Sequence, residues 1–161
     1  LCDALSENGY PQKAFDLILQ EEYPSWLYAV KMGATTIWEH WDGIRPDGTF
    51  WSESMNSLNH YAYGAVASFF YQKIGGIMPM EPGYRKIRIR PMTDRRISYA
   101  KAAIDTVYGV VKSAWRTENG TFLLTVTVPC NTTAEIYLPD GTVYHRGSGC
   151  WRFTCADTDE M

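Results

Sequence analysis

The chain has 161 residues, a formal net charge of −3 and a hydrophobic content of 45%. This length suits one ordinary domain or two small ones, and the apolar fraction suffices for a packed core. Because no basic stripe dominates and no apolar run approaches membrane-spanning length, we expect neither nucleic acid nor a membrane among the partners.

The first part of the sequence has the apolar spacing of short helices. Residues 4–9 resemble a helix tail that ends at Gly9. Pro11 suits the first position of a second helix, and apolar residues at helical spacing continue from it to Leu19. We therefore predict two consecutive helices at the start of the chain.

A third helix is predicted over residues 26–32, with Ser25 as its N-cap and Gly33 as its stop. Residues 34–58 then show no clear period and contain a Pro-Asp-Gly turn signal at 46–48. A loop of this length is uncommon inside a compact domain unless it has a function. This loop is therefore the first place to look for a site.

A longer helix is predicted over residues 60–74, with Asn59 as its cap and the glycine pair at 75–76 as its end. Residues 77–83 carry two prolines and a glycine, which is typical of a linker. The apolar period then changes from that of a helix to that of a strand.

From Tyr84 onwards, apolar residues alternate with polar ones over short runs. An Asn-Gly pair at 119–120 and a Pro-Asp-Gly run at 139–141 each separate two such runs, which predicts two hairpins. The predicted strands lie near 87–89, 107–115, 122–128, 134–138, 142–145 and 151–155. Short strands at this spacing favour an antiparallel β-sandwich.

Helices followed by strands without alternation indicate two domains. We place a helical domain at 1–76, a linker at 77–83 and the β-sandwich at 84–161. A few helices and a long aromatic loop form a poor independent core. The chain also begins without an initiator Met or a signal-like segment. Both features lead us to expect that it was cut from something longer.

The four cysteines, Cys2, Cys130, Cys150 and Cys155, form no C-x-x-C pair and have no His at zinc-ligand spacing. We expect reduced, buried thiols, which slightly favours a cytoplasmic origin and leaves the localisation otherwise unknown. The three histidines are scattered and no glycine-rich phosphate loop occurs. We therefore expect no metal site and no cofactor.

The densest polar and aromatic cluster lies at residues 36–43, where Glu39 stands between Trp38 and Trp41. A carboxylate among aromatic rings loses hydration, and groups in such surroundings serve as general acids or bases. Paired with a second carboxylate across a sugar, Glu39 would suit glycoside hydrolysis. The alternative is structural: the two indoles pack in the core and Glu39 forms a salt bridge.

His60 lies at the start of the predicted longer helix, where the partial positive charge of the helix end disfavours imidazolium. A neutral His at this position can exchange a hydrogen bond with a sugar hydroxyl. The alternative is a capping or packing histidine.

Four blocks of the sequence, in order, are similar to bacterial α-L-rhamnosidases of glycoside hydrolase family 78. They are residues 4–26, 33–43 (Gly-Ala-Thr-Thr-Ile-Trp-Glu-His-Trp-Asp-Gly), 55–66 (Met-Asn-Ser-Leu-Asn-His-Tyr-Ala-Tyr-Gly-Ala-Val) and 82–91. The resemblance covers about residues 3–139 and fades after Gly141. It implies an α+β multidomain fragment: the last helices of an (α/α)₆ barrel, followed by the antiparallel β-sandwich.

The resemblance also implies an inverting mechanism, in which Glu39 is the general base, His60 contacts rhamnose, and Trp38 and Trp41 shape the pocket. The general acid of the family lies in an Asp/Glu-rich motif that this chain lacks, so we expect the chain alone to be inactive. The implied partners are a rhamnose-containing glycan or glycoside and the remainder of the catalytic barrel. Apolar surface left by missing barrel helices would favour self-association.

Two other functions stay open at this point. Another (α/α)₆-barrel glycosidase or lyase with the same ending would act on a different sugar. A non-catalytic carbohydrate-binding or structural module would bind through the sandwich, with Tyr108, Trp115 and Trp151 as an aromatic platform. A strand-like context makes Trp115 better suited to the core. We favour the rhamnosidase.

Overall fold

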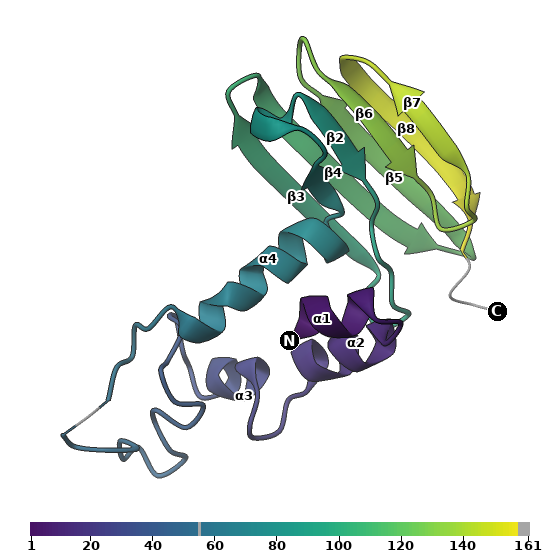
Figure 1. The fold of residues 1–161 in the computed structure, drawn as a ribbon. Helices are drawn as coiled ribbons and strands as arrows, with labels where there is room; N and C mark the ends of the chain where they lie inside the picture. The colour runs from purple at the N-terminus through teal and green to yellow at the C-terminus, as the bar shows by residue number, and fades with distance from the viewer. Residues whose placement is uncertain (55, 158–161) are drawn as a thin grey trace. The chain divides into compact units, whose positions relative to one another are not determined.

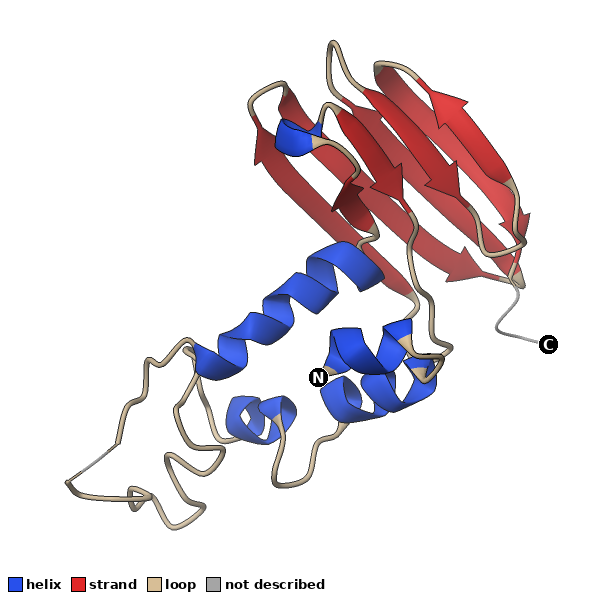
Figure 2. Ribbon diagram, viewed as in Figure 1, coloured by secondary structure: helices blue, strands red, loops and turns tan. Residues whose placement is uncertain are grey.

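The computed structural model describes residues 1–54 and 56–157, which divide into two compact units between Ala67 and Ser68. The first unit holds short helices and the long loop, and the second holds two β-sheets (Figures 1 and 2). No helix within these ranges is both long enough and apolar enough to cross a bilayer.

The three short helices at the start of the chain are confirmed. They are α1 (Cys2–Glu7), α2 (Pro11–Leu19) and α3 (Trp26–Lys31). Gly9 has a φ of 86° after α1, Pro11 occupies the first turn of α2, and the Ser25 hydroxyl accepts the Tyr28 N–H at 2.9 Å. One boundary of each helix therefore follows from the local chemistry of its terminal residues.

The longer helix consists of three consecutive pieces: η1 (Ala62–Val66), α4 (Ala67–Phe69) and η2 (Phe70–Ile74). The prediction that Asn59 caps this helix is wrong. The helix begins at Ala62, whose N–H donates to Nδ1 of His60 at 3.3 Å. The helix thus starts two residues later than predicted, and the side chain of His60, not that of Asn59, accepts its first free N–H.

The predicted β-sandwich is confirmed as two four-stranded sheets, with strand orders β1-β2-β6-β7 and β3-β4-β5-β8 (Figure 1). The strands are β1 (Ile77–Pro79), β2 (Lys86–Ile89), β3 (Tyr99–Thr106), β4 (Gly109–Glu118), β5 (Thr121–Val128), β6 (Thr133–Tyr137), β7 (Val143–Arg146) and β8 (Gly149–Ala156). All neighbours are antiparallel except β2 and β6, which are parallel.

Strict alternation along the strands places apolar side chains on the inner face of each sheet. Ile87 and Ile136 from one sheet, and Val111, Phe122 and Val126 from the other, have no exposed surface. Each full burial of such a side chain contributes roughly 1.5–3 kcal/mol. The apolar core of this unit thus lies between its two sheets.

The predicted hairpins have the expected turns. Between β4 and β5, Asn119 and Gly120 both have positive φ angles, 49° and 70°, as a type I′ turn requires. Between β6 and β7, Asp140 accepts the Thr142 N–H at 2.8 Å, and Gly141 has a φ of 87°. The two hairpins fix the pairing of four of the eight strands.

The segment 77–83 is more ordered than a linker. Ile77–Pro79 forms β1, which pairs with β2 and buries Ile77 completely, and Pro82–Tyr84 forms the short helix η3. Strand β3 is a further element that the sequence did not reveal. The domain limits at 76 and 84 stay predictions.

The expectation that the cysteines are buried is wrong for two of them. Cys2 is buried, but Cys130 and Cys150 are exposed, and all four thiols are free. Cys130 lies in the turn after β5, and Cys150 lies on β8 opposite Thr127, which occupies an outward position of β5. The turn position of Cys130 and the outward strand position of Cys150, neither of which the composition shows, place these two thiols in solvent.

Gly76 is needed where the chain enters the first sheet. Its φ is 73°, and a Cβ at this position would lie 2.3 Å from the backbone nitrogen of Pro91. The Gly76 carbonyl also accepts the Arg90 N–H at 2.8 Å. Only glycine combines this backbone conformation with this approach to the neighbouring chain.

We predict that Gly76→Ala lowers the free energy of unfolding by roughly 3 kcal/mol or more, because backbone strain and overpacking add. Gly141→Ala is the matched control, since Gly141 also has a positive φ but no heavy atom within 4 Å of the built Cβ. Urea unfolding followed by circular dichroism measures both. Equal losses in the two variants would mean that the approach to Pro91 has no energetic consequence.

Asp94 is a buried carboxylate in the connection between β2 and β3, with 2% of its surface exposed. Its Oδ1 accepts from both the backbone N–H and Nε of Arg96, and its Oδ2 accepts from Nη2 of Arg96 at 2.8 Å. These hydrogen bonds to the Arg96 guanidinium lower the pKa of Asp94 below its ordinary value. The ionised form thus stabilises the turn.

Because the folded pKa of Asp94 lies below the unfolded value of about 4, this stabilisation is complete above that pH and is lost as the pH falls through the folded pKa. We predict that Asp94→Asn reduces stability near neutral pH and weakens its decline in acid. Urea unfolding over a pH series tests this, with Asp105→Asn on β3 as an exposed control. An unchanged pH dependence in Asp94→Asn would contradict the assignment.

Candidate functional site

Two segments of the long loop lie side by side through backbone hydrogen bonds. The N–H of Glu39 donates to the carbonyl of Ser57 at 2.9 Å, and the N–H of His60 donates to the carbonyl of Ile37 at 2.7 Å. The Thr36 hydroxyl adds a hydrogen bond to the carbonyl of Leu58. The structure therefore brings the segment of Glu39 beside the segment of His60.

Three rings, Trp26, Trp41 and Tyr63, form what we term the aromatic clamp. Trp41 stacks on Tyr63 with ring centroids 3.9 Å apart, and it meets Trp26 edge to face at 5.1 Å. Trp26 Nε1 donates to the carbonyl of Tyr63 at 2.9 Å. The clamp joins α3, the loop and η1, so that the loop is held at both of its ends.

Gly43 is a second point at which the loop is held. A Cβ built there would lie 3.2 Å from both Leu58 and Trp38. The Gly43 carbonyl accepts from the Trp51 N–H and from Nδ2 of Asn56, each at 3.1 Å. The absence of a side chain lets three parts of the loop converge on this residue.

The predicted turn at 46–48 is confirmed as the tip of a small hairpin within the loop. Ile44 and Phe50 form an antiparallel bridge, and Asp47 accepts the Thr49 N–H at 2.9 Å. The imidazole of His40 stacks on Trp51 at 3.6 Å. The loop is thus an ordered structure with its own contacts.

Glu39, Trp41 and His60 are each half-buried, whereas Trp38 keeps only 4% of its surface exposed. Among residues 1–54 and 56–157, no basic side chain forms an ion pair with Glu39. The structural salt bridge considered for Glu39 is thus not formed there. The other part of the structural alternative, that the two indoles pack inside the protein, does hold: Trp38 is buried and Trp41 stacks on Tyr63.

The imidazole of His60 is oriented by a hydrogen bond with the first residue of the helix that follows it. Its Nδ1 accepts the Ala62 N–H, and its ring lies parallel to that of Tyr61 with centroids 5.8 Å apart. A ring nitrogen that accepts a hydrogen bond carries no proton, so the proton of the neutral imidazole is on Nε2. Nε2 is thereby available as a donor.

Trp38 and Trp41 line a small cavity of about 60 Å³ together with Trp26, Ala29 and Ile37. This cavity is far smaller than the pockets of about 300 Å³ or more that hold small-molecule ligands. In the part of the chain that the structure describes, no three His, Cys, Asp or Glu side chains are grouped to hold a metal ion.

Sequence reasoning missed the clamp partners Trp26 and Tyr63 and the close packing at Gly43. Trp26 and Tyr63 both occur in the blocks that resemble the family, so their position in those blocks was the available signal. Stacking across separate segments has no signature in local spacing, and only the folded loop reveals it.

Comparison with known proteins identifies the class. A family model described as the bacterial alpha-L-rhamnosidase 6 hairpin glycosidase domain matches residues 1–74. A second, the bacterial alpha-L-rhamnosidase C-terminal domain, matches residues 76–149. The chain therefore combines helices of a six-hairpin glycosidase domain with a C-terminal β domain, as expected. It belongs to the bacterial α-L-rhamnosidase family.

Individual relatives agree with this assignment. An α-L-rhamnosidase of Streptomyces avermitilis is 40% identical over 96% of this chain, and one of Formosa agariphila is 45% identical over 86%. The chain spans only 17% and 15% of the length of these relatives.

Solved structures show the same fold. The structure of the Streptomyces avermitilis enzyme complexed with L-rhamnose matches 96% of this chain and 17% of its own, with a TM-score of 0.90 and 40% identity. That of the Aspergillus terreus α-L-rhamnosidase matches 97% of this chain and 19% of its own, with a TM-score of 0.92 and 37% identity.

We predict that Gly43→Ala loosens the loop, because the added methyl group overpacks Leu58 and Trp38 at a cost of about 1–3 kcal/mol. Limited proteolysis should then cleave within residues 34–58 roughly tenfold faster. Gly64→Ala is the control, since its Cβ would meet only Ile37, at an ordinary 3.6 Å. Cleavage of Gly43→Ala at the wild-type rate would show that this packing does not hold the loop.

Proposed function

We propose that the full-length protein carrying this chain is an inverting α-L-rhamnosidase that releases terminal α-L-rhamnosyl residues from glycosides or polysaccharides. The observation that supports it most is the backbone pairing of the segment of Glu39 with the segment of His60, in a chain 40% identical to an enzyme solved with L-rhamnose. Both residues lie in blocks that resemble the family.

In this proposal Glu39 is the general base. Inversion requires an acid and a base roughly 6.5–9.5 Å apart, with a water molecule between the base and the anomeric carbon. Glu39 accepts a proton from that water while the water oxygen bonds to the anomeric carbon and the glycosidic bond breaks. A carboxylate that is half-buried and free of ion pairs within the described ranges is suited to this step.

The general acid, which protonates the departing oxygen, lies outside this chain in the proposal. The chain alone would therefore supply half of the catalytic pair and would not hydrolyse rhamnosides. The helical unit exposes large apolar side chains, including Tyr61 at 87%, Tyr10 at 61% and Val30 at 59%. We propose that the remainder of the barrel covers such residues in the full-length protein.

His60 is proposed to contact rhamnose. Because Nδ1 already accepts the Ala62 N–H, Nε2 is the nitrogen that would donate to a sugar hydroxyl. Trp38 is too buried, and Trp41 too closely stacked on Tyr63, to offer an open ring face in this chain. We propose that these two residues shape the pocket indirectly, by holding the loop that carries Glu39.

The alternative of a sandwich that binds sugar through an aromatic platform has little support. Trp115 is 2% exposed, and its Nε1 donates inward to the carbonyl of Ile74 at 2.7 Å. Trp151 is half-buried, with the guanidinium of Arg146 over its ring at 5.2 Å. Two of the three platform residues, Trp115 and Trp151, therefore do not offer an open ring face.

We predict that Glu39→Gln in the full-length protein lowers kcat on 4-nitrophenyl α-L-rhamnoside by a factor on the order of 10² or more, since the amide cannot accept the proton. Glu53→Gln, at an exposed position of the same loop, should retain activity. Steady-state kinetics on a panel of aryl glycosides measures both the loss and the choice of sugar.

Two results would count against the proposal. Undiminished activity in Glu39→Gln would make Glu39 a structural residue. Preferential cleavage of a different aryl glycoside would assign the protein to another (α/α)₆-barrel activity.

A further inference from the structure

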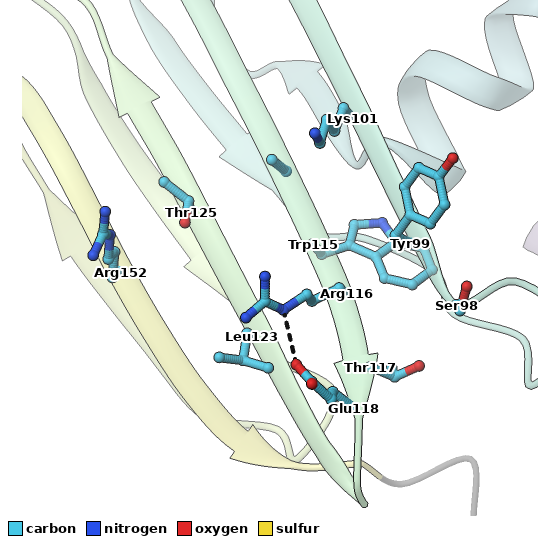
Figure 3. Close-up of a pocket in the computed structure, with 11 residues that line it drawn as sticks. Ser98, Tyr99, Lys101, Trp115, Arg116, Thr117, Glu118, Leu123, Thr125 and Arg152 are labelled. Atoms are coloured by element: carbon cyan, nitrogen blue, oxygen red, sulfur yellow. Dashed lines mark ion pairs between the residues drawn. The ribbon is translucent and has the colours of Figure 1, made fainter.

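The outer face of the β3-β4-β5-β8 sheet is hollowed, with a volume of about 720 Å³ (Figure 3). Strand register explains the hollow. Lys101, Ala114, Thr125 and Arg152 are paired in one row across the four strands. The two central positions carry small side chains, whereas the two outer positions carry long cationic ones. The row therefore forms a shallow floor between two cations.

The hollow is basic although the whole chain is acidic. Lys101 and Arg152 are exposed, and Arg116 lies in the next row of the same face. Figure 3 shows Arg116 beside the row that forms the floor, with its side chain near Leu123 and paired with Glu118. Among residues 1–54 and 56–157, Glu118 is the one acidic residue that lines the hollow, against three cations, whereas the net charge of the chain is −3. Such a local reversal of charge marks a surface suited to an anionic partner.

Arg116 already holds a carboxylate on this face. Its Nε lies 3.3 Å from Oε2 of Glu118, and both side chains are more than half exposed. An ion pair this exposed contributes little to stability, so another carboxylate can replace Glu118 at small cost. The planar guanidinium fork suits carboxylates in particular.

We propose that this hollow binds a glycan chain that bears uronate carboxylates. Lys101 and Arg152 stand on strands three spacings apart, roughly 14 Å between backbones, so a chain of repeated charges fits them better than one small anion. Thr125 offers a hydroxyl on the floor, and Tyr99, 64% exposed and paired with Arg116, offers a ring face for a sugar. The choice of a glycan among anionic polymers rests on the proposed rhamnosidase function.

The test is calorimetric titration of the full-length protein with oligogalacturonate and with its methyl ester, which has the same chain without the charges. We expect binding of the acid form only, weakened when salt rises from about 0.05 to about 0.3 M. Lys101→Gln with Arg152→Gln should lower the affinity at least about fivefold. Lys13→Gln with Arg95→Gln removes equal charge from exposed positions outside the hollow and should leave it unchanged.

Wild-type affinity in the Lys101→Gln, Arg152→Gln variant would overturn the proposal, as would equal binding of the methyl ester. Tighter binding of dextran sulfate or single-stranded DNA than of oligogalacturonate would reject a uronate site. Hydrolysis of 4-nitrophenyl α-L-rhamnoside should be unchanged in the hollow variant and lost in Glu39→Gln. The two proposals can therefore fail separately. A protein that binds oligogalacturonate but does not hydrolyse the rhamnoside would contradict the proposed activity alone, and one that hydrolyses the rhamnoside but does not bind oligogalacturonate would contradict the proposed binding site alone.

Discussion

The candidate site depends on one interaction, the backbone pairing of residues 37–39 with residues 57–60. Neither segment belongs to a regular helix or strand, so two hydrogen bonds alone would not hold them against the entropy of a long loop. The aromatic clamp and the convergence on Gly43 supply the additional contacts. In this way a loop without regular structure holds the backbone segments that carry Glu39 and His60 side by side.

In the second unit, the alternation of inward and outward side chains along the strands produces both the apolar core and the basic hollow. Inward positions such as Val111 and Phe122 form its core, while the outward positions between them form the hollow with Lys101 and Arg152. A uronate-binding face would bring a charged polymer to the protein without any part in bond cleavage. Affinity for the polymer and turnover of a small rhamnoside would then vary independently.

Local chemistry predicted the elements whose ends it controls. Pro11, Ser25 and the Asn119-Gly120 turn each fixed a boundary that the structure confirms. Strand β1 was hidden because prolines lie in and after it, and β3 because two of its four inward residues are alanines, which give a weak apolar signal. The parallel pairing of β2 with β6, and the pairing of the segments that carry Glu39 and His60, arise from tertiary contacts that no local pattern encodes. The roles of those two residues came from resemblance and stay predictions.

In the proposed mechanism, Glu39 activates water on the face of the sugar opposite to the leaving group. Proton NMR of the rhamnose first released from an α-L-rhamnoside by the full-length protein tests it most directly, provided that spectra are recorded before the anomers equilibrate. The account predicts that β-L-rhamnose appears first, because a single displacement inverts the anomeric carbon. Initial release of α-L-rhamnose would require a covalent intermediate and would contradict the assignment of Glu39 as the base of an inverting enzyme.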